Sequence, residues 1–213
     1  MSRTSRFNTA QAQANPTRFR RAAAAIGLAL TAGVLAAPAP AVADGPTPPT
    51  CEGMGIDPAA PIHYRAEAVI KAPLEKVWNL QTDVERWPSW QQPVTSSKRL
   101  DSGPLQPDSQ FRWTTPLPAT AMTAATTLTI TSTVHQMRHE QCIRWSGPAI
   151  GAGLRIDNGI HVWTFTPVDG GVLVRTEENW NGAMVEADVA TSTRFLGAGL
   201  DAWLADLRAA AES

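Results

Sequence analysis

The clearest pattern of hydrophobic and polar positions lies between residues 160 and 180, where two segments alternate with a period of two. In the first segment, His161, Trp163 and Phe165 share one face. The returning segment places on one face Val172, Val174, Thr176, Glu178 and Trp180. This alternation predicts two half-buried antiparallel strands. Because wide rings and two ionisable groups lie on the buried side, the hairpin indicates a lined cavity rather than a plain core.

The turn between these strands determines which residues face each other. If it closes through Asp169 and Gly170, His161 lies opposite Glu178. Side chains paired in this way have Cβ atoms about 4.5–5.5 Å apart, so contact between the imidazole and the carboxylate is feasible. A three-residue loop would shift the register and break the pair.

The same register assigns the other positions of the hairpin. On the His161 side, Trp163 faces Thr176 and Phe165 faces Val174. The opposite side pairs Val162 with Glu177 and Thr164 with Arg175, and we expect that side to be solvated.

The rest of the chain predicts a strand, short helices and further strands in that order. A strand over residues 62–71 precedes Pro73, which suits the first turn of a helix, and a further turn over residues 83–88 ends at Pro88. The residues on the inner side of the first helix are Leu74, Val77, Trp78 and Gln81. Further strands are expected at 94–100, 110–115, 126–136, 141–146, 159–166 and 172–180.

From residue 184 to 211 the apolar positions change to helical spacing. The stripe consists of Val185, Val189, Ser192, Leu196, Leu200, Trp203 and Leu207. Gly197 and Gly199 interrupt it, each at about 1 kcal/mol relative to Ala. Three interpretations of these glycines stay open: the helix merely tolerates them, they mark a break between two helices, or they leave open space above the sheet.

The N-terminal residues 1–43 resemble an export signal. Arg18, Arg20 and Arg21 precede an apolar stretch over 22–36, and Ala41–Ala43 fits a cleavage site before Asp44. The stretch is shorter than the roughly 20 residues of a membrane span, so we expect a secreted or cell-envelope protein with no stable span after cleavage. The alternative is a retained N-terminal anchor, and the choice between Sec and Tat export stays open.

Residues 44–61 contain five prolines and predict an extended leader before the domain of residues 62–213. The chain has two cysteines, Cys51 in the leader and Cys142 in a predicted strand. In an oxidising compartment they form a disulfide that ties the leader to the sheet, or they are two separate thiols, with Cys142 a small core residue.

The charge of the chain excludes some partners. Five of the 18 Lys and Arg residues and none of the 19 Asp and Glu residues precede residue 44, which leaves a formal charge of −6 on the remainder. Nucleic acids and anionic lipids bind to basic surfaces, so neither is an expected main partner. Roughly 170 residues suit one domain with one core.

Several segments resemble the START-like (SRPBCC) polyketide cyclase/dehydrase family. The opening motif is Ile70–Trp78 followed by Asp83–Trp90, and the later matches are Trp145–Gly147, His161–Pro167, Gly170-Gly171 and Glu178–Gly182. The resemblance covers about residues 62–211. It implies an α+β helix-grip fold, in which a curved antiparallel sheet of about seven strands wraps around a long C-terminal helix and encloses a hydrophobic cavity.

The resemblance leaves the function open, because the family includes lipid and hormone binders as well as cyclases. Bacterial polyketide cyclases act in the cytoplasm, and the export signal departs from that. We therefore carry three hypotheses: a secreted binder of a small aromatic or lipid-like molecule, a cyclase or dehydratase, and a cell-envelope interaction protein with a filled core. The oligomeric state is left open.

The candidate site residues follow from the aromatic pattern and from the helical stripe. Three roles are open for His161 and Glu178: acid and base in catalysis, contact with a ligand, or a buried structural pair. In the catalytic role, the carboxylate would raise the pKa of the imidazole toward the working pH. Trp78 and Trp203 are expected in the core. The candidate ligand contacts are Trp87, Trp90, Trp113, Trp145, His161, Trp163, Phe165, Glu178, Trp180, Leu196 and Leu200.

Metal and cofactor motifs are weak. His135 and His139 have the spacing of zinc ligands on a helix, but the preceding residues favour a strand that ends in a turn. Arg144 alternates with Ile143 and Trp145, so it is expected on the outer side, away from a ligand. We expect no metal and no cofactor.

Overall fold

A computed structural model of the chain describes residues 47–119 and 124–213, so the predicted signal segment, with its alternative of a retained anchor, lies outside the described residues. The strands are β1 (Ile62–Ile70), β2 (Ser96–Arg99), β3 (Gln110–Leu117), β4 (Thr126–Arg138), β5 (Cys142–Gly151), β6 (Leu154–Val168) and β7 (Gly171–Asn181). The helices are α1 (Leu74–Thr82), the 3-10 helix η1 (Val84–Ser89), α2 (Ala183–Glu186) and α3 (Val189–Glu212).

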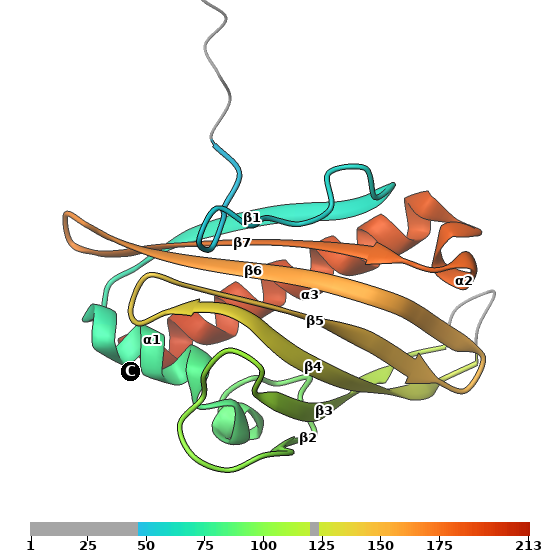
Figure 1. Ribbon diagram of the computed structural model, residues 1–213, viewed down its shortest axis with the longest axis horizontal. Helices are drawn as coiled ribbons and strands as arrows, with labels where there is room; N and C mark the ends of the chain where they lie inside the picture. Colours follow the sequence, from blue (N-terminus) through green and yellow to red (C-terminus); the bar gives the residue numbers. More distant parts are fainter. Residues whose placement is uncertain (1–46, 120–123) are drawn as a thin grey trace, which may run out of the picture. The chain divides into compact units, whose positions relative to one another are not determined.

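Seven antiparallel strands form one sheet in the order β1-β7-β6-β5-β4-β3-β2. Helix α3 runs across one face of this curved sheet, and α1 lies near the C-terminal end of α3 (Figure 1). The predicted α+β helix-grip fold is confirmed. Register shifts after Val134 in β4 and after Gly147 in β5 mark β-bulges, which bend strands. A Cβ atom at Gly147 would lie only 1.8 Å from the Thr131 carbonyl oxygen, so the close approach of β5 to β4 at this point needs glycine.

The β5–β6 hairpin is longer than the sequence pattern predicted. Strand β5 continues to Gly151 and β6 begins at Leu154, whereas the predicted strands ended at residue 146 and began at residue 159. The bulge after Gly147 breaks the period-2 alternation there, which hid the extension.

The predicted register of the β6–β7 hairpin is confirmed. Val168 pairs with Gly171 and His161 pairs with Glu178, so the turn contains only Asp169 and Gly170. Gly170 has φ of 81°, a left-handed conformation that favours glycine in such turns.

The outer side of this hairpin was expected to be solvated, and this expectation is wrong. Val162 is 0% exposed and Glu177 is 5% exposed. The leader covers this side: the Asp57 amide donates to Asn179 Oδ1 at 3.0 Å, and Val162 packs in one cluster with Cys51 and Cys142. The pattern of the hairpin alone does not contain this contact, because the covering segment lies about a hundred residues earlier in the chain.

Cys51 and Cys142 form a disulfide, with an Sγ–Sγ distance of 2.08 Å and a Cα–Cα distance of 5.4 Å. It ties the leader to the outer face of β5. Arg144, one position from Ile143 on the same strand, also holds the leader, because its Nε donates to the Gly55 carbonyl oxygen at 2.9 Å. The predicted outward direction of Arg144 is thus confirmed.

Helix α3 is continuous through its two glycines. The break falls earlier, at Ala187 and Asp188, where Asp188 caps α3 by accepting from the Thr191 amide at 2.9 Å. A Cβ atom at Gly197 would lie 2.9 Å from the ring of Tyr64 on β1, whereas one at Gly199 would meet nothing within 4 Å. Gly197 therefore lets α3 approach β1, and Gly199 borders open space. Among the described helices, none has the length and apolar character needed to cross a membrane.

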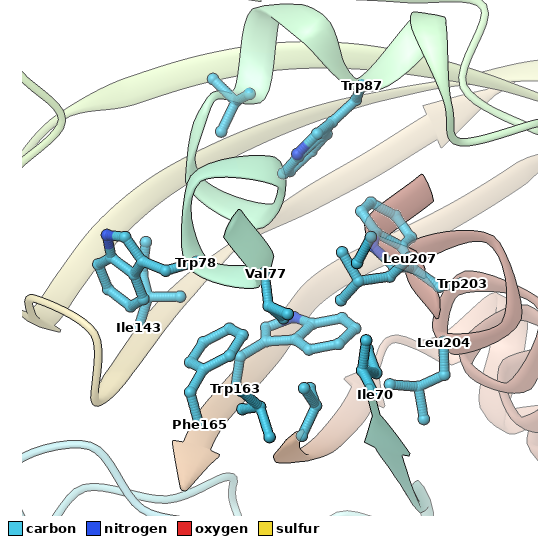
Figure 2. Packing of buried hydrophobic residues seen from close by; sticks show 14 of the residues in the cluster. Ile70, Val77, Trp78, Trp87, Ile143, Trp163, Phe165, Trp203, Leu204 and Leu207 are labelled. Atoms are coloured by element: carbon cyan, nitrogen blue, oxygen red, sulfur yellow. The ribbon is translucent and has the colours of Figure 1, made fainter. Parts of the chain in front are cut away.

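One end of the space between sheet and helix is filled by aromatic and aliphatic side chains. Figure 2 shows Trp163 and Phe165 under α1, with Trp203, Leu204 and Leu207 entering from α3. Trp163 is 0% exposed and Leu207 is 0% exposed. The expectation that Trp78 is a core residue is confirmed, since its ring meets that of Phe165 edge-on at 5.4 Å.

Removal of the disulfide should lower the free energy of unfolding by about 4 kcal/mol, because the bridge closes a long loop in the unfolded chain. The variant is Cys51→Ser with Cys142→Ser, compared with wild type in urea unfolding followed by tryptophan fluorescence. Reduced wild type should match the variant, and reductant should not affect the variant. A difference under about 1 kcal/mol would contradict the assigned role of the leader.

The two glycines of α3 should respond oppositely to alanine. Gly199→Ala should stabilise the protein by up to about 1 kcal/mol through helix propensity. Gly197→Ala adds a methyl group against Tyr64, so we expect it to be less stable than Gly199→Ala by about 1–3 kcal/mol. Urea unfolding of both variants measures the difference, and equal stabilities would show that α3 does not approach β1 at Gly197.

Candidate functional site

The other end of the space between the sheet and α3 is hollow. A cavity of about 200 Å³ lies between strands β3–β7 and the N-terminal half of α3. Its wall is mainly apolar, formed from the sheet by residues such as Trp113, Ile130, Trp145 and Ile156, and from α3 by Leu196, Gly199, Leu200 and Trp203. Trp203 stands at the boundary between this cavity and the packed core.

A second hollow of about 290 Å³ adjoins the first toward α2. Its own walls include Leu154, Met184 and Val185. The residues that line both hollows are Leu117, Leu128, Ile156, Trp180 and Phe195. We call the two the inner and the outer hollow.

The opening lies between α3 and the β3 side of the sheet. Phe195 lines both hollows and is 40% exposed, and Gly199, one turn later, is also exposed. On the facing side, Pro93 and Leu117 line the inner hollow. Since Gly197 packs α3 against Tyr64 of β1, the other flank of α3 is the one left open.

His161 and Glu178 meet on the wall of the inner hollow, as the predicted register required. His161 Nδ1 lies 3.2 Å from Glu178 Oε2, and His161 Nε2 lies 2.7 Å from the hydroxyl of Thr176. The Trp180 indole donates to Glu178 Oε1 at 2.8 Å. Both ring nitrogens of His161 are therefore engaged within the protein, and of these two residues only Glu178 keeps acceptor capacity for a ligand.

Burial moves both groups toward their uncharged forms. It lowers the pKa of His161 to about 3. It raises the pKa of Glu178 to about 7, although the hydrogen bond from Trp180 acts in the lowering direction. The expectation that the carboxylate raises the imidazole pKa is wrong, because the loss of hydration outweighs the attraction of the pair.

The proton on Glu178 determines the tautomer of His161. A protonated carboxyl donates to Nδ1, and the imidazole then carries its proton on Nε2 and donates to Thr176. An ionised carboxylate instead accepts from Nδ1–H, and Thr176 donates to Nε2. The imidazole stays neutral in both states.

The structure brings most of the predicted ligand contacts together around the inner hollow. Those that line it are Trp113, Trp145, His161, Glu178, Trp180, Leu196 and Leu200. The predicted contacts that do not line it are Trp87, Trp90, Trp163 and Phe165.

These four residues have other surroundings. Trp87 is 0% exposed and donates from its indole to the Gln81 carbonyl oxygen at 3.0 Å. Trp163 is equally buried, and Phe165 packs on Trp78. Trp90 is half-buried and its ring meets that of Trp203 at 6.4 Å. Trp87 and Trp90 therefore belong to the packed side of Trp203 rather than to the opening.

Sequence reasoning missed several wall residues. Phe195 lies beside the apolar stripe of α3, four positions before Gly199, and Gly199 itself was one of the two glycines considered for open space above the sheet. Ile156 lies in the part of the β5–β6 hairpin that the broken alternation hid.

The weak metal motif is resolved by local contacts. His135 Nε2 lies 2.7 Å from the Ser146 hydroxyl, and His139 stacks against Trp78 with ring centroids 5.6 Å apart. Within the described ranges, no group of three or more His, Cys, Asp or Glu side chains is placed to hold a metal ion.

The curved sheet, the long helix and the hollow between them define a helix-grip protein. The chain belongs to the family described as polyketide cyclase/dehydrase and lipid transport, whose model matches residues 61–212. No curated protein sequence matches the chain.

Solved structures support the same fold. A START superfamily protein from Mycobacterium smegmatis is 13% identical with a TM-score of 0.53, covering 70% of this chain and 97% of that one. A protein from Thermus thermophilus is 19% identical with a TM-score of 0.54, covering 70% and 96%. A protein from Chromobacterium violaceum is 18% identical with a TM-score of 0.53, covering 72% and 99%. At these identities the likeness shows the fold alone.

The raised pKa of Glu178 predicts how stability depends on pH. The folded state keeps this proton up to about pH 7, above the ordinary value of 4.5, so Glu178 contributes stability that is present below 4.5 and lost as pH rises through 7. Glu178→Gln cannot ionise. Its stability relative to wild type should therefore increase by about 2–3 kcal/mol between about pH 5 and pH 8.

Urea unfolding at a series of pH values measures this difference. Glu75→Gln, at an exposed position of α1, is the matched control and should follow wild type throughout. If Glu178→Gln and wild type also keep a constant difference, the carboxyl of Glu178 is not raised in pKa.

Proposed function

We propose that the protein binds a small aromatic or lipid-like molecule in the two adjoining hollows between α3 and the sheet. The observation that carries this proposal is the change of interior at Trp203, from a packed core on one side to open space on the other. The wall of this space is formed mostly by indole and aliphatic side chains, with a few polar groups, as is typical of small-molecule sites. The family description, which includes lipid transport, agrees with it.

The size of the space limits the ligand. The inner hollow, about 200 Å³, is below the lower limit of roughly 300 Å³ for drug-sized sites. The outer hollow adds about 290 Å³ and shares five wall residues with it. A ligand of useful size would therefore occupy both, and this continuity weighs against the alternative of an interaction protein with a filled core.

A cyclase or dehydratase is the second candidate. The position of Glu178 on the cavity wall, with a pKa of about 7, suits proton transfer to a bound substrate, and His161 would orient its carboxyl. His161→Ala and Glu178→Gln should then abolish turnover. In a carrier, the same variants should weaken binding by only about 1–2 kcal/mol.

We also propose that the chain is exported and cleaved after Ala43. The disulfide between Cys51 and Cys142 supports this, because such bonds persist in oxidising compartments. Expression of the full chain in a bacterium with a periplasm should yield periplasmic protein beginning at Asp44, as read by mass spectrometry. Protein that stays cytoplasmic, or that keeps residues 1–43 in the membrane, would reject cleavage.

A bulky residue at the opening should block ligand entry. Gly199→Trp places an indole where a Cβ meets nothing within 4 Å, whereas Ala198→Trp adds the same indole at an exposed neighbour that does not line the hollows. The probe is N-phenyl-1-naphthylamine, an uncharged dye that fluoresces in apolar surroundings. We expect binding by wild type and Ala198→Trp, and at least about tenfold weaker binding by Gly199→Trp.

Native mass spectrometry of the purified protein, followed by extraction, identifies any ligand that co-purifies. Equal dye binding by both tryptophan variants would place the binding site elsewhere. No dye binding by wild type would reject the carrier function.

A further inference from the structure

In the part of the chain that the structure describes, no lysine or arginine lines either hollow. Among the described residues, the ionisable groups on the walls are His161 and Glu178 in the inner hollow and Asp188 in the outer one. Residues 120–123, which the structure does not describe, contain no charged residue in the sequence. Since a buried charge is costly unless it is paired, a ligand carboxylate, sulfate or phosphate would have no positively charged partner among these groups.

The inner hollow offers one donor without a partner, the indole N–H of Trp113, and acceptors on Glu178 and Gln91. Each oxygen of Glu178 has one partner, from Trp180 or from His161, and a carboxyl oxygen has two lone pairs. Its side chain is 19% exposed and lines the hollow, so this remaining capacity is turned to a ligand. His161 contributes only the face of its ring, since both of its nitrogens are engaged.

Gln91 adds a second acceptor on the same wall. It is 2% exposed, lines the inner hollow, and its Oε1 has no hydrogen-bond partner among the described residues. A buried acceptor without a partner destabilises the protein, so a ligand that brings a donor would be favoured over one that does not.

Resting on the proposed function, we propose that the ligand is an uncharged molecule with a hydroxyl group, an alcohol or a phenol. The hydroxyl donates to the carboxyl of Glu178 in the inner hollow. The apolar remainder extends past Trp180 to Leu154, Met184 and Val185 of the outer hollow. The corresponding carboxylate is rejected.

The outer end also disfavours an anion. Asp188 is fixed there as the cap of α3, and its hydrogen bond from the Thr191 amide lowers the pKa of its carboxyl. An anionic ligand in reversed orientation would therefore place its charge near a carboxylate. Neither end of the combined space compensates a negative head group.

The groups that face Glu178 add no positive charge at neutral pH. His161 on β6 is neutral. Tyr64, which pairs with Glu178 from β1, donates a hydrogen bond from its hydroxyl to Asp201 of α3 at 3.2 Å. Ionisation of Glu178 as the pH rises should therefore strengthen the rejection of an anionic ligand.

Three naphthalene probes of matched shape test this proposal on the wild-type protein. They are 2-naphthol, which brings a donor, 2-methoxynaphthalene, which has none, and 2-naphthoate, which is anionic. Quenching of the intrinsic tryptophan fluorescence at pH 7 measures binding. We expect 2-naphthol to bind about tenfold more tightly than 2-methoxynaphthalene, and 2-naphthoate to bind most weakly.

A pH series and one variant separate the causes. Binding of 2-naphthoate should weaken from pH 6 to pH 8 by roughly tenfold, and Glu178→Gln should remove this dependence and raise its affinity at pH 8. Equal affinities for the three probes, or tightest binding of 2-naphthoate, would overturn the hydroxyl preference and leave the carrier function standing. Binding of none of them would reject both. The comparison in wild type decides the question even if the variant does not fold.

Discussion

The packing of Trp203 against the sheet is the interaction on which the interior depends. Its ring meets those of Trp87, Trp113 and Trp163 at centroid distances of 4.9, 5.5 and 6.0 Å. Its indole donates to Gln81 Oε1 at 3.1 Å, which ties α3 to α1. With this residue fixed, the C-terminal half of α3 packs into a solid core, and the N-terminal half borders the two hollows. A binding site requires both halves, because the packed C-terminal half keeps the N-terminal half of α3 separated from the sheet.

The fold was largely predictable from local patterns. The alternation of His161, Trp163 and Phe165, with a turn at Asp169 and Gly170, was sufficient to predict the β6–β7 register because two-residue hairpin turns leave little freedom. The leader was not predictable in this way. It covers Val162 and binds Asn179 through contacts between segments far apart in sequence, and periodicity carries no information on such contacts.

The sequence pattern predicted which face of the sheet carries the candidate site, but it did not predict which residues on that face line the hollow. Trp145 and Trp163 lie on the same face of the sheet, yet only Trp145 lines the inner hollow. The difference depends on the side of Trp203 on which each strand residue lies: Trp145 lies on the side of the hollow, and Trp163 lies on the side of the packed core. The charge state of His161 was also not predictable from the pattern: an imidazole beside a carboxylate suggests a raised pKa, but burial lowers the pKa of His161.

Crystals of the protein under xenon pressure would test the central claim most directly, because xenon enters apolar cavities and not packed cores. We expect xenon on the Leu200 side of Trp203, between α3 and the sheet, and none on the Leu207 side. An interior with no xenon beside Leu200, filled by the surrounding side chains, would contradict it.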